Sequence, residues 1–481
     1  MTVPKSMDTS EDVPVTSSKK AAENIDQEAV KEEVQRLVST AESGGLAQAT
    51  EGLLAIEKRG RLAEDPVSTK LACCSLLELL YKQQNYKDAQ EKLVLLTKRR
   101  GQLKEVVRAM VRQCMEFLDE MGRETKEEMI RTLQGITEGK IYVEIERARI
   151  TRQLAAMKEQ EGDIGEAANI LQEVAVETFG SMAKVEKIAY ILEQVRLCLE
   201  KKDYVRAQIL SRKVSPRAFV VRKTTKKGES TGEIGIEGTS IEEPAKGTPS
   251  LEELKIQYYS LMIQYHLHEK NYVEVCRSYR AILDTPGIAA DPAAWEDALK
   301  HAAWYAGLAP RDSDQVTLLD ATKADSRMES MPVYKSLLSH FSKDEILWWN
   351  VLSQEFADEM TSQTDVFDED RKQAFRLRVV QHNIYTISSF YSHISMPRLA
   401  QILELSEAEA EKHLCDMVSE RGLAAKIDRA SGTIKFGGVK PKTAVLNEWS
   451  SKISKLLQTL ESTCEMISKE QQQFALASVA K

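Results

Sequence analysis

Residues 395–436 read SMPRLAQILELSEAEAEKHLCDMVSERGLAAKIDRASGTIKF, and this stretch decides the fold of the last third of the chain. Ser395 stands two residues before a proline and opens an apolar run, which predicts a short helix capped by serine. Ser406 and Glu409 have the spacing of a capping box and predict a second helix, which Gly422 is expected to end.

The end of the same stretch alternates apolar and polar residues on both sides of a turn that contains glycine. Residues 424–428 and 433–436 therefore predict the two strands of a β-hairpin. A longer amphipathic helix is predicted before them, over about residues 371–391. Three helices followed by a hairpin form the winged-helix pattern, and this hairpin is the only β structure that the sequence predicts.

Upstream of this module, a helix–turn–helix unit recurs four times. Each copy places Asn or Asp directly before an apolar residue and a small Ala or Val three positions later, as expected for a tight turn between closely packed helices. The copies are Asn85-Tyr86 with Ala89, Asp163-Ile164 with Ala167, Asp203-Tyr204 with Ala207, and Asn271-Tyr272 with Val275.

The spacing of these copies predicts a stacked architecture. Tyr86 and Ile164 are 78 residues apart, or about two units, and Ile164 and Tyr204 are 40 apart. We expect an α-solenoid of helical hairpins. The alternative is a set of unrelated hairpins in an ordinary all-α protein.

The composition agrees with long helices joined by short loops. The 481 residues include only 22 glycines and 12 prolines, and aromatic residues make up 6%. Few turn residues argue against an all-β fold and against a glycine-rich nucleotide-binding α/β enzyme. The expected fold class is all-α: an α-solenoid of helical-hairpin repeats, then a winged-helix module with a small β-hairpin, then a C-terminal helix.

The domain limits follow from these patterns. We expect a disordered tail over residues 1–24, the solenoid over 25–370, the winged helix over 371–440 and a terminal assembly helix over 441–481. Within the solenoid, residues 216–250 are expected to form a charged, flexible insertion. Seven basic residues lie in 212–227 and five acidic residues in 229–243. This pattern fits a solvated loop, with an electrostatic docking strip as the alternative.

Charge and cysteine content limit the cellular context and the partners. The chain has 66 basic and 74 acidic residues and a net charge of −8, which is unfavourable for binding the phosphate backbone of a nucleic acid. Its seven cysteines are scattered without a C-x-x-C pair. No apolar leader and no stretch of about 20 apolar residues are present. We expect a soluble protein of the cytoplasm and nucleus.

The last predicted helix carries a heptad pattern. Apolar residues recur every seven positions at Leu446, Ile453, Leu460, Ile467 and Phe474, and Trp449 and Leu456 fill the intermediate positions. Such a stripe requires a partner helix. An intermolecular bundle is favoured over packing back onto the chain's own winged helix.

No pattern predicts catalysis. The phosphate-loop motif has only a near miss at residues 135–141, one residue short and lacking the terminal hydroxyl. His266 and His268 form the only His-x-His pair, but Cys276 and Tyr279 stand where a zinc hydrolase of that signature would have Ser and Asp. No catalytic residue, cofactor or metal ligand is predicted.

The winged helix raises the question of nucleic-acid binding. A recognition helix that enters the major groove needs basic or amide side chains at the exposed positions of its N-terminus. Here the third helix opens with Glu407, Glu409 and Glu411, although the wing carries Lys426, Arg429 and Lys435. The pattern favours a protein-interaction module over a DNA reader.

Several segments resemble a known family. The string TEGKIYVEIERAR at residues 137–149, shorter strings at 96–100, 176–182 and 279–286, and the run 382–436 resemble the PCI-domain scaffolds. Within that family they resemble the branch of the fifth non-ATPase subunits of the proteasome lid. A structural departure is the insertion at 216–250, which is longer and more charged than is expected for the family.

The resemblance implies a non-catalytic scaffold that supports lid assembly and the degradation of ubiquitinated proteins. Its implied partners are other PCI and MPN subunits of the lid, with winged helices joined side by side and C-terminal helices gathered in one bundle. No nucleic acid, membrane or cofactor is implied. The interface residues expected on this basis are Lys426, Ile427, Ile434, Phe436, Leu446, Trp449, Ile453, Leu456, Leu460, Ile467 and Phe474.

Two alternatives stay open. The first is a sister scaffold with the same architecture, subunit four of the COP9 signalosome. The second belongs to another class, a winged-helix protein that binds nucleic acid.

Overall fold

The computed structural model describes residues 27–42, 45–219, 244–245, 247–362, 366–420, 422–437 and 442–479. The predicted tail and most of the predicted insertion lie outside the described residues. The chain divides into two compact units: unit 1 comprises Met1–Ser215 with Val221–Thr248, and unit 2 comprises Pro216–Val220 with Pro249–Lys481. The domain limits given above stay predictions.

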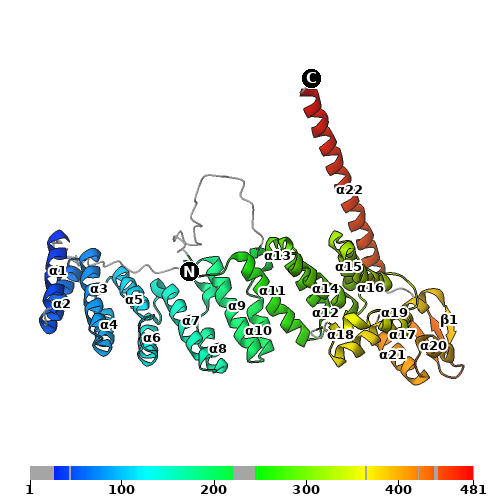
Figure 1. The fold of residues 1–481 in the computed structure, drawn as a ribbon, viewed down its shortest axis with the longest axis horizontal. Coiled ribbons are helices and arrows are strands. Elements are labelled where there is room, and N and C mark those ends of the chain that lie inside the picture. The colour runs from blue at the N-terminus through cyan, green and yellow to red at the C-terminus, as the bar shows by residue number, and fades with distance from the viewer. Residues whose placement is uncertain are drawn as a thin grey trace, which may run out of the picture. The chain divides into compact units, whose positions relative to one another are not determined.

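Unit 1 is a row of antiparallel helical hairpins, each packed on the next, as Figure 1 shows from blue to green. Its helices are α1 (Gln27–Glu42), α2 (Leu46–Leu62), α3 (Pro66–Lys82), α4 (Tyr86–Lys98), α5 (Lys104–Phe117), α6 (Arg123–Thr137), α7 (Glu144–Gln160), α8 (Ile164–Gln172), α9 (Lys184–Glu200) and α10 (Tyr204–Ser211), with 3₁₀ turns η1 (Ile141–Val143) and η2 (Val176–Thr178). The predicted solenoid is confirmed. The hairpin α5–α6 is the unit that the double spacing from Tyr86 to Ile164 predicts between its neighbours.

The four sequence units coincide with real turns. Asn85, Asp163, Asp203 and Asn271 are each the N-cap residue of a second helix, and the small residue three positions into that helix is buried in every case. The residue before each cap has a positive φ: Gln84, Gly162, Lys202 and Lys270. Its amide and that of the cap bond back to the preceding helix, which is the Schellman pattern that closes a helix end.

Only one of these four left-handed positions carries glycine, so the other three are strained. Lys202 has φ 64°. Replacing it with glycine is expected to stabilise the chain by about 1 kcal/mol, because only glycine adopts this conformation without a Cβ clash. Urea unfolding of the full chain measures the change. Lys201→Gly is the matched control, since Lys201 has a helical φ of −69° and should lose stability instead. Equal effects of the two changes would contradict this account.

Ion pairs join successive hairpins at buried carboxylates. Glu146 of α7 is 1% exposed and accepts a 2.7 Å hydrogen bond from Nε of Arg112 in α5. Glu186 of α9 is 4% exposed and accepts two bonds, of 2.8 and 2.9 Å, from Arg149 of α7. The partners are 34 and 37 residues apart, close to one repeat. The same type of pair therefore recurs along the stack, and nothing in the sequence pattern indicated it.

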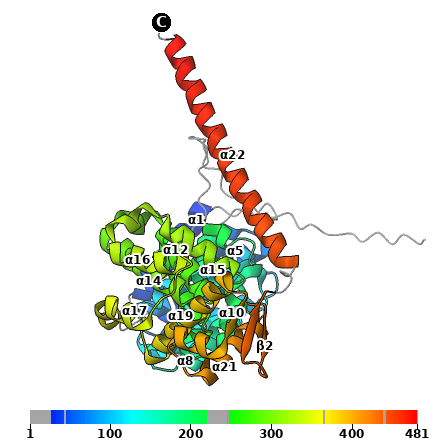
Figure 2. The ribbon, with the colours of Figure 1, turned by 90° about the vertical axis from the view of Figure 1, so that its right-hand side faces the viewer.

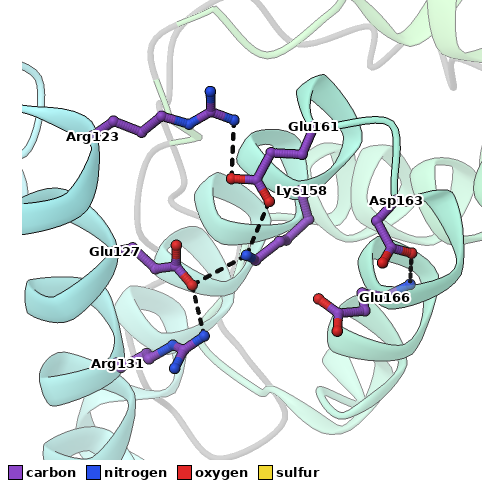
Figure 3. Close-up of polar contacts among 7 residues, drawn as sticks. All are labelled: Arg123, Glu127, Arg131, Lys158, Glu161, Asp163 and Glu166. Atoms are coloured by element: carbon purple, nitrogen blue, oxygen red, sulfur yellow. Dashed lines mark hydrogen bonds and ion pairs between the residues drawn. The ribbon is translucent and has the colours of Figure 1, made fainter.

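A more exposed network connects α6 to α7 (Figure 3). Lys158 of α7 contacts Glu127 of α6 at 3.1 Å and Glu161 at 3.0 Å, and Arg123 of α6 contacts Glu161 at 2.9 Å. The hydrogen bond to Glu161 raises the pKa of Lys158, and the same bond lowers the pKa of Glu161. Beside it, Oδ1 of Asp163 accepts a bond of 2.9 Å from the amide of Glu166 and caps α8. The ion pair thus favours the protonated form of Lys158 and the ionised form of Glu161.

Unit 2 begins with helical hairpins and then changes to the winged helix. Its elements are η3 (Pro216–Phe219), α11 (Leu251–His268), α12 (Tyr272–Leu283), α13 (Pro286–Ala290), α14 (Pro292–Leu308), α15 (Ser313–Lys323), η4 (Ser326–Ser330), α16 (Pro332–Ser342), α17 (Trp349–Glu355), α18 (Ala357–Ser362), α19 (Glu369–Phe390), β1 (His393–Ser395), α20 (Met396–Leu403), α21 (Glu407–Ser419), β2 (Ala425–Asp428), β3 (Thr433–Phe436) and α22 (Lys442–Val479).

An aromatic cluster ties the repeat helices of unit 2 to α19. Trp304 of α14 is fully buried. Its ring meets those of Phe356, Phe367 and Phe375 edge-to-face, at centroid distances of 5.8, 4.6 and 5.7 Å. Edge-to-face pairs add to the hydrophobic gain of burial. Because Phe375 lies in α19, the first helix of the winged helix shares a core with the preceding repeats.

Candidate assembly interface

The winged helix forms as the local signals predict, with one addition. Ser395 is the N-cap residue of α20, although its side chain makes no capping hydrogen bond. Ser406 and Glu409 form a reciprocal capping box at the start of α21, with bonds of 3.3 and 3.2 Å. The hydrogen bond from Ser406 lowers the pKa of Glu409. The predicted hairpin is confirmed as β2 and β3, but a third strand, β1, pairs with the other side of β3. Sequence reasoning missed β1 because three residues are too few to show alternation.

The sheet order is β1-β3-β2, so β3 is the central strand and β2 is an edge strand. β3 is paired on both sides, with β1 and with β2. Ile434 and Phe436 of β3 are 0% and 7% exposed and belong to the core of the winged helix, with Leu399 and Leu414. Both side chains are covered in the isolated chain, and their interface role stays a prediction.

The outer edge of β2 is the open edge of the hairpin (Figure 2). Gly437 donates to the carbonyl of Ala424, so hydrogen-bonded pairs with β3 alternate from Ala424. This alternation directs the amide and carbonyl groups of Ala425 and Ile427 away from β3. Lys426 is exposed and Ile427 is partly buried. Of the four predicted hairpin residues, these two lie at the edge.

The heptad residues of α22 lie on a single helix whose described side chains are exposed in the isolated chain. Leu446, Trp449, Ile453, Leu456, Leu460 and Ile467 are between 52% and 65% exposed. Phe474 lies in α22, but its side chain is outside the described part of the chain. An exposed apolar stripe of this length marks an interaction surface. The interface role of all the predicted residues stays a prediction.

Sequence reasoning missed three flanking residues that widen this stripe. Val445, Leu457 and Met466 are 40%, 58% and 61% exposed and occupy the g, e and g positions beside the a/d stripe. A narrow a/d stripe is typical of a two-stranded coiled coil, whereas added e or g residues are typical of a helix in a larger bundle. These flanking apolar residues are visible in the sequence, but the heptad prediction considered the a and d positions alone.

The basic wing is partly neutralised within the module. Arg429 forms an ion pair with Glu411 of α21 at 2.6 Å. Lys426 and Lys435 face each other in register across β2 and β3. Together with Glu407 and Glu409 at the start of α21, this gives a surface of mixed sign. A duplex-binding helix would require a positive one.

The residues considered for chemistry occupy ordinary positions. Gly135 lies inside α6 and cannot form a phosphate-binding loop there. His266 and His268 lie in the last turn of α11, and burial lowers the pKa of His266. Among the described residues no group of His, Cys, Asp and Glu has the geometry of a metal site. Nor does any helix in that part of the chain combine the length and apolarity needed to cross a bilayer.

A helical-repeat stack followed by a winged helix and an exposed terminal helix defines the PCI class of proteins, and the PCI domain model matches residues 354–437. Two further models match: "PSMD12/CSN4, N-terminal" over residues 48–228 and 239–291, and "26S proteasome regulatory subunit RPN5 C-terminal domain" over residues 444–473. The chain belongs to the family of the 26S proteasome non-ATPase regulatory subunit 12, also named RPN5.

Relatives match along almost the whole chain. It is 44% identical to 26S proteasome non-ATPase regulatory subunit 12 homolog B of Arabidopsis thaliana, over 89% of this chain and 97% of the relative. It is 38% identical to the subunit 12 protein of Dictyostelium discoideum, over 89% and 91%. It is 32% identical to RPN5 of Saccharomyces cerevisiae, over 96% and 98%. The resemblance to lid subunits is confirmed.

Proposed function

We propose that this chain is a non-catalytic scaffold subunit of the 26S proteasome lid, which supports lid assembly and the degradation of ubiquitinated proteins. Its partners are other PCI and MPN subunits of the regulatory particle, and its location is the cytoplasm and nucleus. The observation that carries the proposal is the exposed apolar stripe of α22, which falls within the region matched by the RPN5 C-terminal model.

The stripe supports assembly on energetic grounds. Complete burial of a Leu or Ile side chain contributes roughly 1.5–3 kcal/mol, so the six described heptad residues offer a large gain once they are covered. The flanking residues Leu457 and Met466 favour a bundle of several helices over a simple pair. A scaffold subunit whose terminal helix packs against helices of several neighbours would bury these residues.

The edge of β2 supports a second contact. Its outward backbone groups at Ala425 and Ile427 can extend the sheet by adding a strand from a neighbour. Short strands and a lysine at the edge limit uncontrolled pairing, and both features occur here, since β2 has four residues and Lys426 is exposed. The winged helix is thus suited to specific lateral contact.

The decisive experiment compares two double variants of the full chain. Ile453→Asp with Leu460→Asp places charges in the stripe, whereas Ser451→Asp with Gln458→Asp places them on the opposite, f-position face of α22. We expect the first variant to lose co-purification with a tagged lid subunit and the second to retain it. Both should unfold at the wild-type temperature, because neither face is buried in the free chain. Full incorporation of the first variant would refute the proposal.

A truncation and a mass-spectrometric readout separate the rival functions. Truncation after Val439 should leave a folded chain that does not enter the complex. Co-purification of proteasome ATPases supports a lid subunit, whereas COP9 signalosome subunits in their place would support the sister scaffold. Salt-dependent binding of duplex DNA with tight affinity would instead support a nucleic-acid function.

A further inference from the structure

Arg378 of α19 is a largely covered cation bonded only to neutral groups in the described part of unit 2. Its Nε donates to the carbonyl of Leu308 at 3.1 Å, and its Nη1 donates to Oε1 of Gln381 at 2.5 Å. No carboxylate lies within ion-pair distance of it among the described residues. Burial lowers the pKa of Arg378, although the charge of Glu420 acts in the opposite direction. A covered cation of this kind gains stability from an anionic partner.

Arg378 lines a small cavity together with other polar side chains. The cavity has a volume of about 20 Å³ and is bordered by Arg311, Gln315, Gln381 and His382. This volume holds roughly one water-sized atom. The side chain of Arg311 is 33% exposed, so the cavity meets solvent on that side. The cavity therefore has room for a single oxygen atom of an anion.

His382 orients Arg311 without adding charge. Its Nε2 lies 3.1 Å from the carbonyl of Glu345, which can only accept, so Nε2 carries the proton. Its Nδ1 is then free to accept from Nη1 of Arg311 at 3.4 Å. Burial lowers the pKa of His382 to about 4, and the ring is neutral near pH 7. The positive charge of the cavity therefore comes from the two arginines.

We propose that the cavity between Arg311 and Arg378 binds a tetrahedral oxyanion, inorganic phosphate or sulfate. Two guanidinium groups supply the charge and the fork of donors that such anions prefer. Asp344 is the current ion-pair partner of Arg311, at a loose 3.6 Å. Among the described residues, Asp344 is the one carboxylate in contact with Arg311 or Arg378. It therefore competes with the anion for the guanidinium of Arg311.

The test is calorimetric titration of the full chain with sodium phosphate at constant ionic strength. The wild type is expected to bind saturably, and Arg378→Met to lose about tenfold or more in affinity, as hydrogen bonds to charged groups require. Asp344→Asn should bind several-fold more tightly, because the competing carboxylate is gone. Arg376→Met is the matched control: Arg376 lies on the same helix, is exposed, does not border the cavity, and should leave the affinity unchanged.

Three outcomes would overturn the proposal. These are the absence of saturable binding by the wild type, an unchanged affinity in Arg378→Met, and equal binding of acetate, which would indicate a carboxylate site instead. Because Arg378 also bonds Leu308, its loss could unfold the chain. Arg311→Met then takes its place, since the Arg311 side chain is partly exposed and its removal should lower the affinity by a similar factor. An unchanged affinity in that variant counts equally against the proposal.

Discussion

Replacing Arg149 with methionine is expected to destabilise the α7–α9 junction by about 3–5 kcal/mol. The change removes both hydrogen bonds to Glu186, whose side chain is only 5% exposed. The carboxylate is then buried without a counter-charge, and the cost of its lost hydration is no longer offset. Hydrogen exchange of α7 and α9 amides measures the loss locally, which matters because repeat stacks can unfold in parts.

A double variant separates the loss of the pair from the exposure of an unpaired charge. Arg149→Met with Glu186→Leu removes both charges and should recover most of the protection, because apolar residues of similar volume can replace a buried ion pair. Glu78→Ala, which breaks the exposed pair of Glu78 with Lys82, is the surface control and should cost less than about 1 kcal/mol. A double variant as unstable as Arg149→Met would show that the charge imbalance is not the cause.

Asn383→Asp is expected to have the second large effect, about 3 kcal/mol at neutral pH. Asn383 of α19 is 4% exposed, and its amide holds both backbone groups of Leu347: Nδ2 donates to the carbonyl and Oδ1 accepts from the amide, each at 2.8 Å. Aspartate has the same shape, but it places an acceptor against the carbonyl of Leu347. The segment between α16 and α17 would lose its anchor on the winged helix.

The same variant carries a pH signature. Burial raises the pKa of the introduced carboxyl above its unfolded value, so the destabilisation is full at neutral pH. It is relieved as the pH falls and the carboxyl is protonated, because the neutral acid can donate to Leu347. The difference in unfolding free energy from the wild type, measured between pH 7 and pH 5, should therefore shrink. Asn350→Asp, at an exposed position, should change stability by less than about 1 kcal/mol at either pH. A pH-independent difference would contradict the mechanism.

Local signals were enough to predict most elements of the fold. The Asn and Asp caps, the capping box at Ser406 and the alternation around Gly432 each act within a few residues, so they are readable from sequence alone. The exposed stripe of α22 was likewise visible, because a heptad repeats along one helix.

Contacts between distant residues could not be predicted in this way. Arg149 and Glu186 meet only because two hairpins stack, and Asn383 meets Leu347 only because a loop folds onto α19. The central position of β3 depends on β1, whose residues lie 38 to 42 positions upstream of their partners in β3. The burial of Ile434 could not be predicted for that reason, because its environment is set by a partner strand too short to recognise.

The exposed apolar stripe on α22 also limits the solubility of the free chain. In the free chain, the side chains of Trp449, Leu456 and Ile467 are exposed to water. Two such copies offer each other the same apolar surface, so excess synthesis over the other subunits leads toward self-association. We therefore expect the solubility of the free chain to rise when other helices cover this stripe.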